Sequence, residues 1–141
     1  MTETGNTATR TAACGCGKLT ATVRGEPTEV YLCSCLDCQR LSGSSFTYCA
    51  LFPERAVTIA GERKAWRHLA DSGRWVENGF CPACGVTVFF LAEAMPGIIG
   101  VTAGCFADPH FAQPTKVYWA SRRHDWLAFP EGVALIGTQP D

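Results

Sequence analysis

The sequence has no excess of basic side chains, with 12 lysines and arginines against 13 aspartates and glutamates. A nucleic-acid-binding domain usually carries a basic stripe or a clear positive excess, so this balance argues against nucleic acid as a partner. No apolar run approaches the roughly 20 residues that a membrane-spanning helix needs. The first ten residues are polar and lack the apolar core of a signal peptide. We therefore expect a cytoplasmic protein with no membrane partner.

Internal repeats, low-complexity segments and a long helical period are also missing. Short stretches rich in β-branched and aromatic residues alternate instead with turn residues, at intervals of about 8 to 12 residues that are typical of an all-β domain. A chain of 141 residues, 47% of them hydrophobic, is large enough for one domain with a core. We predict a mainly β single domain of small antiparallel sheets at residues 12–132, with tails at 1–11 and 133–141.

The clearest local signal is a hairpin. Residues 64–70 and 74–80 are rich in aromatic residues and flank Asp71-Ser72-Gly73, a sequence that favours a tight turn. Residues 39–42 predict one helical turn that ends at Gly43. Further strands are expected at residues 18–24, 29–32, 46–52, 56–60, 86–91, 98–106 and 115–120, and residues 126–129 are expected to pack onto the body.

Cysteine, in contrast, is abundant, with nine residues in the chain. A secreted disulfide framework would explain many cysteines, but the count is odd and no signal peptide is visible. Closely spaced thiols on tight turns are typical of metal ligands. Seven of the nine fall in three such clusters: Cys14-Gly15-Cys16, Cys33-Ser34-Cys35-Leu36-Asp37-Cys38 and Cys81-Pro82-Ala83-Cys84.

Seven thiolates divide naturally into four and three. A structural zinc takes four protein ligands, whereas a catalytic zinc keeps one position open for water or substrate. We interpret the two flanking pairs as one closed structural site and the central triplet as an open site that carries the chemistry. The closed site would use Cys14, Cys16, Cys81 and Cys84, and the open catalytic site would use Cys33, Cys35 and Cys38.

The order of these motifs resembles the glutathione-dependent formaldehyde-activating enzyme family, also called the GFA or centromere-protein-V family. The residues around the motifs agree with this resemblance: Gln39 and Arg40 after the triplet, Gly85 after the last pair, and Gly43, Gly61, Gly104, Asp108, Pro109 and Trp126 elsewhere.

The resemblance implies an Mss4-like β fold with two zinc ions per chain. The structural zinc would lie on the flanking cysteine pairs and the functional zinc on the triplet. It also implies that glutathione condenses with formaldehyde to S-hydroxymethylglutathione, a reaction classed with those of carbon–sulfur lyases. The expected partners are therefore a small thiol and a small aldehyde.

The chemistry of the triplet favours delivery of a thiolate. The thiolate is the nucleophilic form of a thiol, and a metal deprotonates a thiol that it coordinates. Three anionic thiolates weaken the ability of the same zinc to polarise an aldehyde oxygen, so we expect this second role to be minor. Arg40 follows the triplet directly and is expected either to bind a substrate carboxylate or to be a surface arginine.

Two other functions stay open at this point: a zinc-stabilised carrier of glutathione or another thiol, and a protein-interaction module. Cys49 and Cys105 have no close cysteine partner in sequence. Each is expected to be a small buried hydrophobe within a strand, the alternative being a fourth ligand to the triplet site. The histidines are candidate ligands or proton carriers, or else surface and core residues: His68, His110 and His124.

Overall fold

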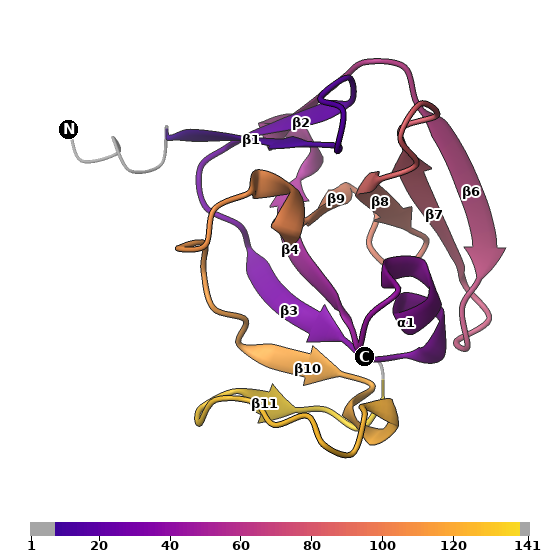
Figure 1. Ribbon diagram of the computed structural model, residues 1–141, viewed down its shortest axis with the longest axis vertical. Helices are drawn as coiled ribbons and strands as arrows, with labels where there is room; N and C mark the ends of the chain where they lie inside the picture. The colour runs from indigo at the N-terminus through magenta and orange to yellow at the C-terminus, as the bar shows by residue number, and fades with distance from the viewer. Residues whose placement is uncertain (1–7, 139–141) are drawn as a thin grey trace. The chain divides into compact units, whose positions relative to one another are not determined.

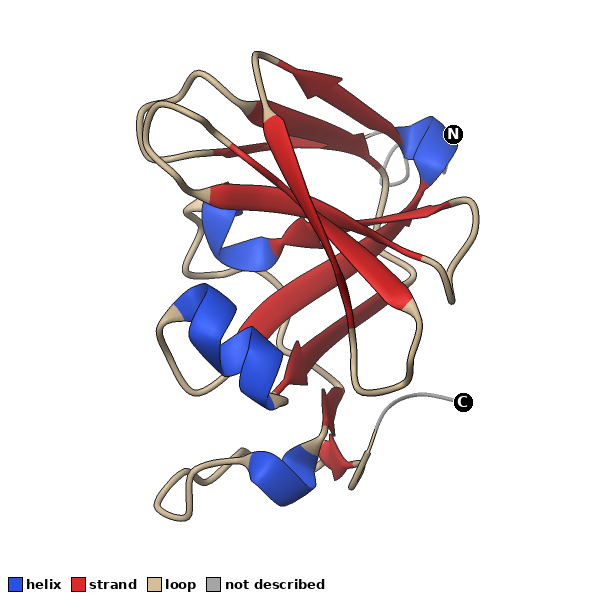
Figure 2. Ribbon diagram, turned by 90° about the vertical axis from the view of Figure 1, so that its right-hand side faces the viewer, coloured by secondary structure: helices blue, strands red, loops and turns tan. Residues whose placement is uncertain are grey.

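The computed structural model of the protein describes residues 8–138, in which eleven strands and one α-helix make a mainly β fold. This confirms the predicted fold class (Figures 1 and 2). The chain divides into two compact units: residues 8–28 and 50–111 form unit 1, and residues 29–49 and 112–138 form unit 2. Within the described residues, no helix has the length and apolar character that a bilayer crossing requires.

Unit 1 contains an antiparallel three-stranded sheet in the order β1-β2-β5. Alternate residues point inward, so that Ala21 and Val23 of β2 are fully buried while their neighbours are not. The first strand begins at Thr9, inside the segment that was expected to be a tail, whose first seven residues lie outside the described part. The bounds are β1 (Thr9–Ala13), β2 (Thr20–Arg24) and β5 (Val57–Ala60), with the 3-10 turn η2 (Glu54–Ala56) before β5.

Unit 1 also holds strands in the order β4-β9-β8-β7-β6, of which β4 contributes its residues from Ala50 onward. The predicted hairpin is present, because Leu69 pairs with Trp75 across a turn in which Gly73 has a φ of 84°. The bounds are β4 (Thr47–Pro53), β6 (Lys64–Leu69), β7 (Trp75–Phe80), β8 (Thr87–Ala92) and β9 (Ile98–Thr102).

Glycines and aromatic rings pair across these strands. Gly79 lies opposite Phe89, and Gly100 lies opposite Phe90. A methyl group at either glycine would come within 2.3 Å and 2.1 Å, respectively, of the ring opposite. The rings therefore cover bare backbone, a known device for stabilising glycine within a sheet.

One predicted strand of unit 1 is shorter than expected. The stretch 98–106 leaves the sheet after Thr102 and continues as the 3-10 turn η3 (Ala103–Phe106). Cys105 therefore lies in this turn and not within an apolar strand. The turn ends at Ala107 in the left-handed conformation, with a φ of 53°, which reverses the chain where a strand would continue.

Unit 2 is a mixed sheet in the order β11-β10-β3-β4. β10 runs parallel to both β3 and β11, an arrangement that the expected antiparallel sheets did not include. Leu32, Val117 and Ala120 form its buried core. The bounds are β3 (Glu29–Cys33), α1 (Leu36–Ser42), β10 (Lys116–Tyr118), the 3-10 turn η4 (Ala120–Arg122) and β11 (Ala134–Leu135).

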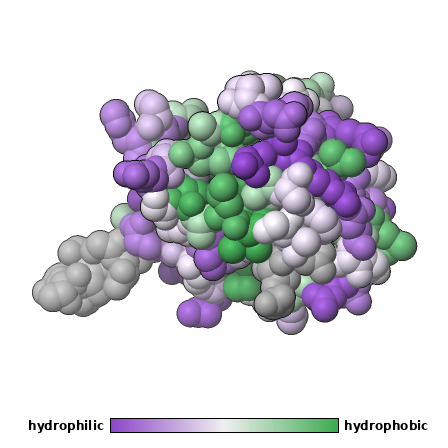
Figure 3. All heavy atoms as spheres, turned by 90° about the horizontal axis from the view of Figure 1, so that it is seen from below, coloured by the Kyte–Doolittle hydropathy of each residue, from purple (hydrophilic) through white to green (hydrophobic). Residues whose placement is uncertain are grey.

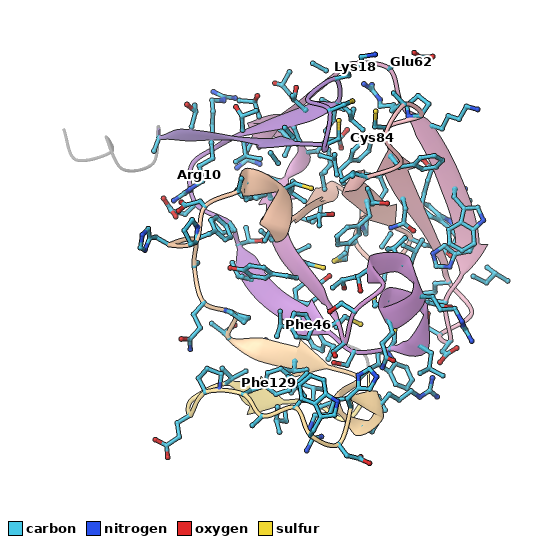
Figure 4. All side chains as sticks on the ribbon, in the orientation of Figure 1. Arg10, Lys18, Phe46, Glu62, Cys84 and Phe129 are labelled. Atoms are coloured by element: carbon cyan, nitrogen blue, oxygen red, sulfur yellow. The ribbon has the colours of Figure 1, made fainter. Side chains whose placement is uncertain are left out.

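The segment after η4 packs onto this core as predicted. Phe129 meets Phe46 with ring centroids 6.3 Å apart (Figure 4). Other apolar side chains of the segment stay exposed, including Trp126 at 75% and Leu135 at 49%. In the view from below, hydrophobic side chains gather among polar ones near the middle of the face (Figure 3).

Candidate metal centres

Two turns of unit 1 present the flanking cysteine pairs. Cys14 and Cys16 lie between β1 and β2, where the Gly17 N–H donates to the Cys14 carbonyl oxygen at 3.1 Å. Cys81 and Cys84 lie between β7 and β8 (Figure 4), where the Gly85 N–H donates to the Cys81 carbonyl oxygen at 2.7 Å. In both turns the amide of the glycine after the second cysteine bonds to the carbonyl oxygen of the first, across three positions at Cys14 and four at Cys81.

The two turns meet through small side chains and backbone. A methyl group on Gly15 would lie 3.7 Å from the Cys84 Sγ, so the first turn faces a thiol of the second at this point. The glycine after each cysteine pair has a left-handed backbone conformation, with a φ of 82° at Gly17 and 80° at Gly85. Glycine adopts this conformation without steric cost.

The sulfur positions fit a tetrahedral metal. All four Sγ atoms lie within 4.8 Å of one another, with 3.7 Å between Cys14 and Cys16 and 3.6 Å between Cys16 and Cys81. A tetrahedral site with Zn–S bonds of about 2.3 Å places its sulfurs about 3.8 Å apart. The donor set and its dimensions thus suit a closed zinc site.

Backbone amides support negative charge at this cluster. The Leu19 N–H donates to the Cys14 Sγ at 3.3 Å, and the Ala83 N–H donates to the Cys81 Sγ at 3.3 Å. Burial by itself would raise the pKa of Cys14, but the Leu19 amide and the neighbouring thiols lower it to about 6. Hydrogen bonds to a charged form favour that form, so these turns suit thiolate ligands.

The triplet lies at one end of unit 2, where β3 gives way to α1. Cys33 is the last residue of β3, Cys35 is the N-cap of α1, and Cys38 lies within its first turn. The Cys35 Sγ accepts the Cys38 N–H at 3.3 Å, as a capping serine or aspartate oxygen would. The left-handed Gly43 ends the helix. The expected helical turn at 39–42 is therefore the second half of a longer helix.

The three Sγ atoms of the triplet also lie within 4.8 Å of one another. Among residues 8–138, no fourth cysteine, histidine or carboxylate joins this group at that limit. Zinc prefers four ligands and binds three protein ligands where a substrate or water takes the fourth place. The donor set fits zinc with one open position.

Hydrogen bonds among the three thiols shift their pKa values in different directions. Hydrogen bonds from the thiols of Cys33 and then Cys38 hold the pKa of Cys35 well below its usual range. The same bond with Cys35 raises the pKa of Cys33. Bonds with Cys33 and then Cys35 raise the pKa of Cys38. Within the group, the hydrogen bonds therefore favour negative charge most at Cys35.

A tyrosine and a further thiol accompany the triplet within unit 2. Tyr31 precedes Cys33 by two positions on β3 and thus lies on the same face of the strand. Its hydroxyl lies within hydrogen-bonding reach of the Cys49 thiol. Cys49 is buried, and this burial raises its pKa to about 11. Cys49 is therefore a neutral buried thiol outside the triplet group.

The other predicted candidates lie outside both clusters. The Arg40 side chain is 79% exposed and lies 3.7 Å from an Asp37 carboxylate oxygen. Cys105 is half-buried and near the closed cluster, where its Sγ donates to the Thr87 carbonyl oxygen at 3.5 Å. His68 stacks on Trp66 and bonds Asn78, whereas the other two histidines are exposed: His110 and His124.

The sequence reasoning named Gln39 only as part of the motif and missed its role in the site. Its Nε2 donates to the Ser34 carbonyl oxygen, inside the triplet, and to the Arg122 carbonyl oxygen, each at 2.9 Å. The position of Gln39 directly after Cys38 was the available signal. Its partner lies 83 residues away, which no local pattern reveals.

Comparison with known proteins agrees with this arrangement. The sequence model of a family described as glutathione-dependent formaldehyde-activating enzyme matches residues 9–122, which include all the clustered cysteines. Among solved structures, the crystal structure of a Rhodobacter sphaeroides protein is similar, with a TM-score of 0.53. The two are 17% identical in sequence over 74% of this chain and 91% of the other. This second likeness concerns the fold alone.

Proposed function

Because the chain belongs to the glutathione-dependent formaldehyde-activating enzyme family, we propose that it condenses glutathione, or a similar thiol, with formaldehyde or another small aldehyde. The catalytic residues in this proposal are Cys33, Cys35 and Cys38, and the activity is that of a carbon–sulfur lyase of the S-(hydroxymethyl)glutathione synthase type. Arg40 is proposed to contact the thiol substrate. Two zinc ions per chain complete the proposal.

The observation that carries this proposal is the incomplete ligand set of the triplet. Three thiols converge within 4.8 Å without a fourth protein ligand in the described chain. A site with a purely structural role gains nothing from an unfilled position, whereas binding a substrate thiol requires one. The contrast with the four thiols of the other cluster, in the same chain, sharpens this point.

Zinc held by the triplet would supply a cation that lowers the pKa of a thiol placed against it. The protein holds the three ligands ready for this through local hydrogen bonds. The Cys38 N–H fixes the Cys35 Sγ, and the Gln39 amide holds the carbonyl oxygen between Cys33 and Cys35. These two hydrogen bonds orient the cysteine ligands without occupying the open position.

The overall reaction needs no oxidant or reductant. The substrate sulfur forms a bond to the aldehyde carbon, the carbonyl π bond breaks, and the proton lost by the thiol ends on the new hydroxyl oxygen. In the reverse direction the same carbon–sulfur bond is cleaved, as expected of a lyase. Reduced cysteines are required throughout, so the proposal also places the protein in a reducing compartment such as the cytoplasm.

Binding is tested first, by the melting temperature of the zinc-loaded protein with increasing glutathione. A ligand that binds only the folded state raises this temperature with concentration. S-methylglutathione keeps the carboxylates but has no ionisable thiol, so it should give little of the shift. The variant Cys35→Ala should lose about one zinc and the glutathione effect. Equal shifts from both compounds would mean that the sulfur does not reach the site.

Turnover is tested by the rate at which glutathione and formaldehyde interconvert with their adduct, measured by exchange NMR spectroscopy. The wild-type protein should raise this rate above the spontaneous one, and Cys35→Ala should not. Glutathione binding without any acceleration would instead indicate a thiol carrier. No response to any small thiol would favour the interaction-module function.

A further inference from the structure

The helix that carries part of the triplet is not held by hydrophobic burial. α1 has seven residues, none of them buried, whereas most helices in proteins are stabilised by packing of an apolar face. Within the described chain, the hydrogen bonds of α1 run to residues 33–44, with the exception of one bond from the Gln39 side chain. The position of Cys38 on this helix therefore depends on the helix caps and on Gln39.

Gln39 joins two backbone segments of unit 2. A primary amide nitrogen carries two hydrogens, and the Gln39 Nε2 donates to the Ser34 carbonyl oxygen and to the Arg122 carbonyl oxygen, each at 2.9 Å. The first bond holds the backbone between Cys33 and Cys35. The second reaches the last residue of η4, at the end of a helical turn where carbonyl groups have no partner within the turn itself. One side chain thus connects the triplet loop to η4.

The same part of the chain also bonds the triplet loop directly. Ser34 is fully buried, and its N–H donates to the Tyr118 carbonyl oxygen at 2.9 Å. Both backbone polar groups of Ser34 are therefore tied to the stretch 118–122, the N–H directly and the carbonyl oxygen through Gln39. The middle of the triplet loop is held at two points by a segment that lies more than 80 positions away in the sequence.

The C-terminal segment 136–138 in turn anchors η4. Trp119 precedes η4 with a φ of 56° and a ψ of 38°, in the left-handed region that bulky residues rarely adopt. The Trp119 N–H donates to the Thr138 carbonyl oxygen at 2.7 Å, and the Ala120 N–H donates to the Ile136 carbonyl oxygen at 2.8 Å. Such a conformation persists only where the surrounding structure enforces it. These bonds therefore fix the turn that Gln39 uses as its support.

The two cysteine clusters differ in how much they need such support. The closed cluster takes four thiols from two turns, so a metal ion bound there links both turns. The triplet takes three thiols from one stretch of six residues and has one ligand fewer. Hydrogen bonds that orient metal ligands typically change metal affinity by about 10- to 100-fold. We expect the open site to depend on them more than the closed site does.

We propose that Gln39 is a positioning residue for the metal ion of the triplet. By tying the triplet loop to η4, which the C-terminal segment 136–138 anchors, it sets the geometry of the three thiols and their affinity for the ion. This inference rests on the metal site of the proposed function and not on the reaction of thiol with aldehyde. Segments remote from the cysteines thus determine how firmly the open site holds its metal.

The test measures the zinc affinity of the triplet by competition with a chromophoric chelator, using zinc-loaded full-length protein. The ion of the triplet is identified as the one that Cys35→Ala lacks. Gln39→Met removes both amide bonds at similar size and should lower the affinity of this ion about 10- to 100-fold. The affinity of the closed cluster should change less than twofold, because its turns lie in unit 1.

A spectroscopic readout separates positioning from a general contribution to stability. Cobalt(II) in place of zinc gives visible absorption bands that depend on the arrangement of its thiolate ligands. The difference between the spectrum of a protein and that of its Cys35→Ala form reports on the triplet alone. This difference spectrum should change in Gln39→Met. Circular dichroism then shows whether the variant keeps the wild-type fold.

Two more variants supply a control and a test from the other end of the network. Gln113→Met removes the same amide from an exposed position of unit 2 and should leave both zinc affinities unchanged. Ser121→Ala removes the 2.6 Å bond from the Ser121 hydroxyl to the Gly137 carbonyl oxygen, which also joins η4 to the C-terminal segment. It should weaken zinc binding at the triplet about threefold, the effect of one hydrogen bond.

The outcomes distinguish this inference from the function beneath it. If wild-type protein holds zinc at the closed cluster alone, the proposed function is wrong and this inference falls with it. If wild-type protein holds two ions and Gln39→Met keeps the wild-type affinity and cobalt spectrum, the positioning role is wrong while the proposed function stands. Loss of both ions together with the fold in Gln39→Met, with no effect of Ser121→Ala, would also overturn it. Selective weakening of the triplet, absent in Gln113→Met, supports it.

Discussion

Loss of one thiol should affect stability very differently in the two cysteine clusters. We consider Cys81→Ser, because the Cys81 side chain is 1% exposed and its Sγ lies 3.6 Å from that of Cys16. These two residues are 65 positions apart, so a shared metal closes a long loop. The corresponding change in the triplet, Cys35→Ala, opens a site whose ends are only five positions apart, at Cys33 and Cys38.

Chain entropy sets the scale of this difference. If a metal bridge acts as a cross-link, it reduces the conformational entropy of the unfolded chain and so stabilises the folded state. The gain in free energy of unfolding is about 4 kcal/mol for the 65-residue loop and about 2 kcal/mol for a five-residue loop. The stability of a whole domain is typically about 5–15 kcal/mol. Metal binding energy adds to both terms, since ligands gathered only in the folded state couple binding to folding. Cys81→Ser should therefore aggregate or unfold, whereas Cys35→Ala should stay folded.

The assay is urea denaturation followed by circular dichroism, with zinc per chain measured on the same samples. The matched control is Cys105→Ser, which removes a half-buried thiol of unit 1 outside the closed cluster and should keep both zinc ions. A soluble Cys81→Ser protein with a normal midpoint and full zinc would refute the closed site. Unfolding of Cys35→Ala as severe as that of Cys81→Ser would make the triplet structural.

Two further substitutions, one in each unit, test contacts that stabilise the fold. In unit 1, a methyl group at Gly61 would lie 1.9 Å from the Lys18 carbonyl oxygen, where φ is 106°, so Gly61→Ala should lower the free energy of unfolding by at least about 2 kcal/mol. Gly73→Ala, at a left-handed glycine with open space, should cost less, and equal losses would contradict the contact. In unit 2, Tyr118→Phe removes a 2.7 Å bond to Glu29 and should cost about 1 kcal/mol in urea unfolding; an unchanged midpoint would contradict its role.

Features with a local cause were predictable from the sequence. The Asp71-Ser72-Gly73 turn fixes the β6–β7 hairpin because its residues suit a tight reversal between two aromatic-rich strands. The close spacing of the cysteines places each pair, and the triplet, on one turn of backbone. Because a structural zinc takes four protein ligands, the count of cysteines then suggested that the two flanking pairs form one site and the triplet another. The structure brings together the two flanking pairs that this count had grouped.

Features that depend on distant partners were not predictable. β1 reads as a polar tail because Thr9, Arg10 and Thr11 carry no apolar pattern, and the strand forms only by pairing with β2. The parallel pairing of β10 with β3 joins segments that are far apart in the chain, and β11 then pairs with β10 in the same direction. A single sequence contains no local signal for either, because strand pairing is decided by long-range contacts.

The helix α1 shows why the triplet was easier to predict than the element that carries it. This helix has seven residues, none of them buried, and isolated helices of this length are unstable in water. Capping at both ends stabilises the helix instead: the Cys35 Sγ accepts the Cys38 N–H at the start, and Gly43, in the left-handed conformation, ends the helix. The N-cap is itself a proposed metal ligand, so the bond that begins the helix also aims the thiol. A pattern search that expects an oxygen-bearing N-cap misses such a helix, while a search for metal ligands finds its first turn.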